Sequence, residues 1–250
     1  MFFLETNKIE YKERNYRDLI EVRDLISFQI KEEESDLYIR ANQKLASHAR
    51  QLLINYREQI ESYIESHPLF KRTLLPYPQD DESPEIINSM IQAANLFGVG
   101  PMATVAGAIA EFVGKELSNY TSEVIVENGG DIFIKSNKER KVSIFAGESP
   151  LSQKIILKIE AQKNFVGICT SSGTVGPSLS FGKADAVTVI SDSVLLADAA
   201  ATAVGNIVKS KEDIEKGLIY AQKIKGIKGI VIIKDDKMGL WGDINFNVIK

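Results

Sequence analysis

Asp198 and Thr202 stand four positions apart in the apolar segment VLLADAAATAVGN, which runs from Val194 to Asn206. Residues at this spacing lie on one face of a helix, and a helix that is apolar nearly all round is buried. Because an isolated buried carboxylate is costly, Asp198 needs a partner, which could be a lysine such as Lys183, a set of backbone N–H groups or a metal ion. A carboxylate, a hydroxyl and carbonyl oxygens form a hard-oxygen set suited to Mg²⁺ or Ca²⁺. The spacing alone leaves a metal site and a structural role open.

Two glycine-containing stretches could bring their backbones close to a ligand. FGVGPMATVAG, residues 97–107, leads through Gly100 into a helix start, where unpaired N–H groups and the helix dipole favour phosphate. No Gly-Lys-Ser/Thr follows it, so it is not a Walker loop. ENGGDI, residues 127–132, is a hairpin-turn signal whose glycines also permit a close approach to a ligand. Helix punctuation and an ordinary turn are the structural alternatives.

A third stretch, CTSSGTVGPSLSFGKAD, covers residues 169–185 and is rich in glycine, serine and threonine. So many small donors after a strand could wrap an anionic group, and a flexible loop is the alternative. Cys169 is the only cysteine of the chain. We expect it to be a small buried strand residue, because a reactive thiol would need a nearby cation or helix start.

Three of these motifs occur in the order found in a known family. ENGGDI, GICTSSG and AVTVISDSVLLADAAATAV resemble segments of the ApbE-like superfamily, over roughly Phe97 to Ile207. The best-known members are magnesium-dependent flavin transferases, which move FMN from FAD onto a threonine or serine of a target protein. The resemblance implies a T-fold-like α+β domain with a largely antiparallel sheet and packed helices. It also implies that Asp198 and Thr202 hold Mg²⁺.

The resemblance further implies where FAD or a related nucleotide would bind. The ENGGDI turn matches the turn near the flavin nucleotide, and the segment that follows Cys169 matches the strand end that borders the same cleft. Together with the glycine of the helix-start stretch, the expected cofactor-binding residues are Gly100, Asn128, Gly129, Gly130, Asp131, Thr170, Ser171, Ser172 and Gly173.

The chain departs from the transferases at two polar positions. Counting back from Gly129, the acid and the lysine of their DLGGIAKG segment fall on Val99 and Val105. The histidine-bearing segment that precedes VTV in the transferases is replaced by GPSLSFGKAD. Both losses remove groups that would contact or activate the nucleotide, and only Asp131 and Asp185 are plausible acids nearby. An enzymatic activity is therefore left open.

Two functions remain at this point. The first is a protein that binds a phosphate-bearing or flavin-like ligand with Mg²⁺, in which the metal neutralises phosphate charge and serves as Lewis acid and template. The second is a non-catalytic ApbE-like binding or assembly protein in a metabolic pathway such as sulfur assimilation. The absent lysine and histidine favour the second.

The elements upstream of the motifs are predicted to be a hairpin and helices. Alternating apolar residues within 26–40 predict the hairpin, and helical spacing of apolar residues predicts a long amphipathic helix over about 42–66. A helix follows with Ser83 as N-cap, Pro84 in its first position and Gly98 at its exit. The next runs from about Gly100 to Asn119. Small residues that allow a close approach line one side of it, namely Ala103, Ala106, Gly107 and Ala110.

Downstream, the sequence is rich in β-forming runs. Strands are expected at 123–128, 131–136, 141–146, 154–160, 165–171, 186–191, 229–233 and 246–249, with helices at 194–206 and 211–223. Helices and strands do not alternate strictly, which favours α+β with antiparallel pairing over a doubly wound parallel sheet. We expect a single domain over 1–250. Its hairpin and long helix lie in 1–75, its motif-bearing core in 84–210 and its last helix and strands in 211–250.

Composition limits the classes of partner. The chain has 250 residues, 44% of them hydrophobic, and a net charge of −4, which argues against nucleic acid or an anionic membrane as the main partner. No run reaches the roughly 18 apolar residues of a membrane span, and a single cysteine fits a reducing cytoplasm. Neither His48 nor His67 belongs to a metal-ligand spacing. A homodimer is the default expectation for the oligomeric state.

Overall fold

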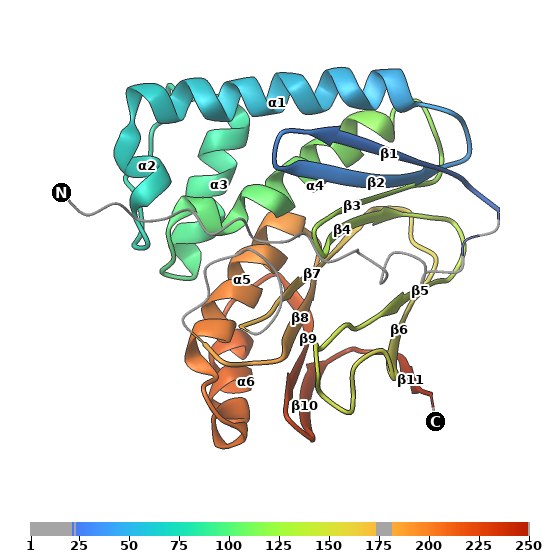
Figure 1. Cartoon of the computed structure of the whole chain (residues 1–250), viewed down its shortest axis with the longest axis vertical. Helices are drawn as coiled ribbons and strands as arrows, with labels where there is room; N and C mark the ends of the chain where they lie inside the picture. The colour runs from blue at the N-terminus through green and yellow to red at the C-terminus, as the bar shows by residue number, and fades with distance from the viewer. Residues whose placement is uncertain (1–21, 23, 174–181, 250) are drawn as a thin grey trace.

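One large antiparallel sheet organises the fold, as seen in a computed structural model that describes residues 22, 24–173 and 182–249 (Figure 1). Its strand order is β1-β2-β3-β4-β7-β8-β9-β10. A second sheet has the order β11-β6-β5. The strands are β1 (Ile26–Glu32), β2 (Ser35–Ala41), β3 (Val124–Asn128), β4 (Asp131–Lys135), β5 (Arg140–Ser143), β6 (Ile155–Ile159), β7 (Val166–Ser171), β8 (Ala186–Ser191), β9 (Ile227–Lys234), β10 (Lys237–Gly242) and β11 (Phe246–Val248).

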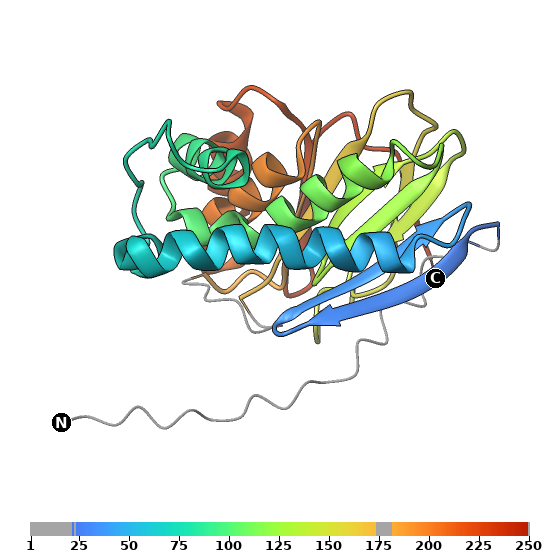
Figure 2. The ribbon, with the colours of Figure 1, turned by 90° about the horizontal axis from the view of Figure 1, so that it is seen from above.

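The helices gather on one face of the large sheet (Figures 1 and 2). The helical elements are α1 (Ala46–Ser66), α2 (Pro68–Arg72), α3 (Glu85–Leu96), η2 (Pro101–Thr104), α4 (Val105–Leu117), α5 (Val194–Ile207), η3 (Lys211–Asp213) and α6 (Ile214–Gln222). Helix α4 packs on β3 and β4, whereas α5 packs on β7 and β8, so the two helices lie side by side. The mixed helices and antiparallel strands confirm the predicted α+β class.

Two apolar cores lie on opposite faces of the large sheet, because successive side chains of a strand point to opposite faces. On β7, Cys169 belongs to the core under the helices and Ile168 to the core that is shared with the small sheet. On β3, Val126 and Ile125 divide in the same way. This alternation decides which side of the sheet each predicted site residue can face.

Most of the predicted elements are present. The hairpin forms β1 and β2, and the long helix forms α1. Strand β10 was not predicted. The expected N-cap of α3 is wrong: Pro84 occupies that position, and the Ser83 hydroxyl instead donates to the carbonyl oxygen of Asp80 at 2.7 Å. Gly98 lies just after this helix with φ +67°, as a helix exit requires.

No single helix in the described part of the chain is both long and apolar enough to cross a membrane. In the same part of the chain, the helical segments Glu85–Leu96 and Pro101–Leu117 are long and apolar enough only when they are taken together, and they meet at a sharp bend.

Candidate functional site

Asp198 finds its hydrogen-bond partner where helices α4 and α5 pack against each other. Helix α5 begins after Ser193, and its apolar residues bury it against β7 and β8. Asp198, one turn into the helix, is 8% exposed and accepts a hydrogen bond from the Gly107 backbone N–H to Oδ2 at 2.9 Å. Lys183 is exposed, and among the described residues no lysine, arginine or histidine forms an ion pair with Asp198.

Gly107 makes this contact possible because it has no side chain. A Cβ at this position would lie 2.9 Å from the Asp198 Cβ and 2.9 Å from the Val194 carbonyl oxygen, closer than such atoms approach in proteins. Of the small residues predicted to line one side of this segment, Gly107 therefore serves a close contact between α4 and α5.

Asp131 and Cys169 lie on the same side of the sheet as Asp198. They are direct partners in the β4–β7 pairing, so their side chains point to the same face. The Cys169 thiol is fully buried and donates to the Val194 carbonyl oxygen on α5 at 3.3 Å. We call these three residues the Asp131–Cys169–Asp198 cluster.

Burial and like charge dominate the electrostatics of the cluster. Burial raises the pKa of Asp198 well above its usual range, the charge of Asp131 raises it further, and the hydrogen bond from Gly107 opposes the shift. Burial also raises the pKa of Asp131 from 3.8 to about 7, against a hydrogen bond with Cys169. The pKa of the Cys169 thiol is raised as well, by burial and then by both carboxylates. In the absence of a cation, the cluster therefore favours bound protons over negative charge.

The Asn128–Asp131 turn joins the cluster to the start of α4. The Asn128 side-chain amide donates to the Ala106 carbonyl oxygen at 3.1 Å. Gly129 and Gly130 have φ of +67° and +110°, as expected for a tight two-residue hairpin turn. The Gly130 N–H is already bound to Glu127 Oε1 at 3.1 Å. Of the two glycines, Gly129 is the exposed one.

The predicted residues Thr170 to Gly173 do not all face the cluster. The Thr170 hydroxyl lies 2.9 Å from the Thr188 hydroxyl, on the face of the sheet opposite to Cys169. Ser171 points to the helix side, where its hydroxyl lies 3.5 Å from the place a Cβ on Gly205 would take. Ser172 is partly exposed, and the Gly173 N–H donates to Ala184 at 2.9 Å. Residues 174–181 lie outside the described part of the chain.

Gly100 and Thr202 have different surroundings. A Cβ on Gly100 would lie 2.0 Å from the Thr73 carbonyl oxygen, so this glycine permits a backbone contact with the segment after α2. Thr202 is partly exposed on α5, one turn beyond Asp198. Of the two, only Thr202 shares an element with the cluster.

The residues present fit a magnesium ion better than a thiolate or imidazole metal. Within the described ranges, no group of three or more histidine, cysteine, aspartate or glutamate side chains forms a metal cage. Mg²⁺ is usually bound by one or two carboxylates, with water and substrate phosphates completing its coordination. Asp198, with Asp131 beside it and the Thr202 hydroxyl one turn away, supplies oxygens of that kind.

Sequence reasoning missed Glu111, a buried carboxylate on α4. Its Oε2 accepts hydrogen bonds from the Ser193 hydroxyl at 2.9 Å and from the Val194 and Leu195 N–H groups at 2.6 and 3.3 Å. Its other oxygen pairs with Lys115 at 2.6 Å. The available signal was one acid among small and apolar residues in GAIAEFVG.

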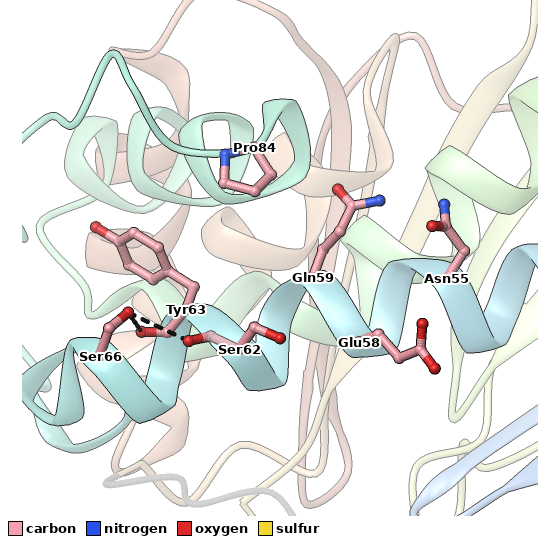
Figure 3. A pocket seen from close by; sticks show the side chains of 7 residues that line it. All are labelled: Asn55, Glu58, Gln59, Ser62, Tyr63, Ser66 and Pro84. Atoms are coloured by element: carbon pink, nitrogen blue, oxygen red, sulfur yellow. Dashed lines mark hydrogen bonds between the residues drawn. The ribbon is translucent and has the colours of Figure 1, made fainter.

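A surface hollow of about 390 Å³ lies elsewhere, between α1 and the start of α3 (Figure 3). Tyr63 and Pro84 line it, and the Tyr63 hydroxyl donates to Asp80 at 2.8 Å. None of the predicted site residues is among those that line it, namely Asn55, Glu58, Gln59, Ser62, Tyr63, Ser66 and Pro84.

Comparisons with known proteins give the family and the fold. A family model described as AbpE bacteria matches residues 17–226. The UPF0280 protein of Methanosarcina acetivorans is 40% identical over 198 residues, which cover 78% of each chain. The UPF0280 protein of Methanocaldococcus jannaschii is 42% identical over 201 residues, or 78% of this chain and 82% of that protein.

Two solved structures share the fold at low sequence identity. The H257G mutant of the flavin transferase ApbE from Vibrio cholerae matches with a TM-score of 0.57 and 14% identity over 87% of this chain and 96% of its own. The flavinyl transferase ApbE of Pseudomonas stutzeri matches with 0.54 and 16% over 87% and 94%. The chain is thus a member of the AbpE bacteria family, similar to the UPF0280 proteins, and has the fold of the ApbE flavin transferases.

Proposed function

We propose that the protein binds a divalent cation, Mg²⁺ in the first place, together with a phosphate-bearing ligand of the flavin-nucleotide class. The observation that carries the proposal is the buried pair Asp131 and Asp198, which no cationic side chain of the described residues neutralises. Two neighbouring carboxylates in a water-poor site need a proton or a cation. The fold found in flavin transferases supports the ligand class.

The residues of the cluster and its neighbours would have different roles in binding the cation. Asp198 Oδ2 is oriented by the Gly107 N–H, which leaves Oδ1 to face a cation. Thr202 follows on the same face of α5, and Asp131 adds a second negative charge. The Asn128 amide holds the turn between β3 and β4 against α4 through its hydrogen bond to the Ala106 carbonyl oxygen. A bound Mg²⁺ would supply charge neutralisation at the phosphates and Lewis acidity.

We propose binding and not flavin transfer as the primary function. The two histidines of the chain both lie on or beside α1, where His48 packs on Tyr120 and His67 stacks on Tyr63. Neither therefore serves as a base at the cluster. By the sequence resemblance, Val99 and Val105 replace the acid and the lysine of the transferases' DLGGIAKG segment.

The test is thermal unfolding with FAD, with and without Mg²⁺, accompanied by an assay of AMP release. We expect FAD to raise Tm only when Mg²⁺ is present, because a ligand that binds the native state stabilises it. Asp198→Asn should abolish this shift. Asp185→Asn is the matched control: Asp185, the other candidate acid, is an equally buried carboxylate, but it accepts from the Asp235 N–H just after β9 and pairs with Lys234 at 3.5 Å.

Three outcomes separate the possibilities. A Tm shift without AMP supports the binding function, and AMP release that Asp198→Asn removes would instead establish transfer. No shift with FAD, FMN or other nucleotides in the presence of Mg²⁺ would overturn the proposal and favour an assembly protein.

A further inference from the structure

We infer that Glu111 is a positioning residue that sets the place of Asp198 within the proposed cation site. This inference rests on the proposed function, but it names a residue outside the cluster. Glu111 belongs to α4 and is 4% exposed. Its carboxylate accepts hydrogen bonds from backbone N–H groups in the first turn of α5. It therefore joins the helix that carries Asp198 to the helix that carries Gly107.

Two hydrogen-bonded contacts connect α4 and α5 in one register. Glu111 contacts Val194, and Gly107, four residues earlier on α4, contacts Asp198, four residues later on α5. Four residues are close to one helical turn, so both contacts lie on the same facing sides of the helices. A displacement of α5 along its axis that breaks the first contact would also move Asp198 away from the Gly107 N–H.

The charge of Glu111 suits this position. The first N–H groups of a helix have no partner within the helix and carry the positive end of its dipole. The Ser193 side chain accepts from only one of them, the Leu196 N–H, at 3.3 Å. Glu111 Oε2 satisfies two others, while Lys115, itself half-exposed, balances its charge from the solvent side.

The close approach at Gly107 makes the cluster sensitive to this contact. Because the facing backbones leave no room for a Cβ, the two helices have only one favourable spacing at this point. Residues that orient a metal ligand through a second hydrogen bond typically change metal affinity by about 10- to 100-fold when they are replaced. Glu111 hydrogen-bonds the backbone of α5 and not Asp198 itself, so we expect an effect at the lower end of that range, about 10-fold.

The experiment compares the full-length protein with Glu111→Gln, which keeps the shape of the side chain and removes its charge. Mg²⁺ binding by calorimetry should weaken by about 10-fold. Hydrogen exchange of the Gly107 amide, measured without metal, should become faster. Glu123→Gln is the matched control, because Glu123 is an equally buried carboxylate that lies just before β3 and accepts from Ser136 and Arg140 instead of from α5. It should lower Tm and leave both readouts unchanged.

The outcomes distinguish this inference from the proposed function. If Glu111→Gln lowers Tm but changes neither Mg²⁺ affinity nor Gly107 exchange, Glu111 is only a helix cap and the inference is wrong. If the wild-type protein binds no Mg²⁺, the proposed function fails, and unchanged Gly107 exchange in the variant would then reject the inference as well. Should Glu111→Gln not fold, Glu111→Asp keeps the charge with a shorter reach, and the same two readouts decide.

Discussion

The Gly107 backbone N–H donates to Asp198 Oδ2 at 2.9 Å across the contact between α4 and α5, and these residues are 91 positions apart in the chain. The carboxylate of the candidate site is therefore oriented by the backbone of another helix. That arrangement requires glycine at position 107, because any Cβ there would meet both the Asp198 side chain and the Val194 carbonyl oxygen.

Replacing this glycine gives the first prediction. Gly107→Ala should lower the free energy of unfolding by about 1–3 kcal/mol, because an added methyl group in a filled contact forces the helices apart. Gly205→Ala is the control: it lies in α5, and its Cβ would meet nothing closer than 3.5 Å. That variant should be neutral or slightly stabilising because alanine favours a helix. Urea denaturation gives the free energy of unfolding of both variants. Equal values for the two would contradict the prediction.

Stability should depend on pH through the Asp131–Cys169–Asp198 cluster. The pKa values of Asp131 and Asp198 are raised on folding, so the folded state binds protons that the unfolded state releases. The stabilisation due to Asp131 is complete below about pH 4 and is lost as the pH rises through about 7, the pKa of this residue. In EDTA, Tm should therefore fall over this window.

Asp131→Asn is the variant that tests this pH dependence. Its Tm should change less between pH 4 and pH 7 than that of the wild-type protein, because the carboxyl group of Asp131, whose pKa is raised to about 7, is gone. If Tm depends on pH in the same way in the variant and in the wild-type protein, the cluster is not the cause of the pH dependence.

The buried ion pair between Arg140 and Glu123 should contribute strongly to stability. Both side chains are almost fully buried, and Arg140 also pairs with Asp24 at 2.8 Å. Arg140→Met leaves Glu123 charged and without its guanidinium, which should cost about 3–5 kcal/mol. Lys138→Met removes the exposed partner of Asp24 and should cost at most about 1 kcal/mol. Chemical denaturation measures the free energy of unfolding of both variants. Similar losses of stability in the two would contradict the prediction.

Cys169 should be inert in the native protein. Burial and the neighbouring carboxylates raise the pKa of its thiol, whereas the thiolate is the reactive form. A thiol reagent at pH 8 should therefore label Cys169 only as fast as the protein opens, and at once in guanidinium chloride. Rapid labelling of the native protein would show that the cluster is open to solvent.

Local patterns were sufficient for most of the elements. Period-two alternation predicted β1 and β2, the glycine pair predicted the turn between β3 and β4, and the apolar run around Asp198 predicted a buried α5. Such patterns report which side of an element is buried. They also marked Asp198 as an acid that needs a partner.

The sequence by itself thus determined the elements, the burial of α5 and the residue type at the centre of the candidate site. The tertiary structure decided that Gly107 is the partner of Asp198, that Glu111 caps α5, and that Thr170 faces the opposite side of the sheet from Cys169. The physical reason is that periodicity records only whether a side chain is buried. The neighbour that it meets depends on how distant helices and strands pack.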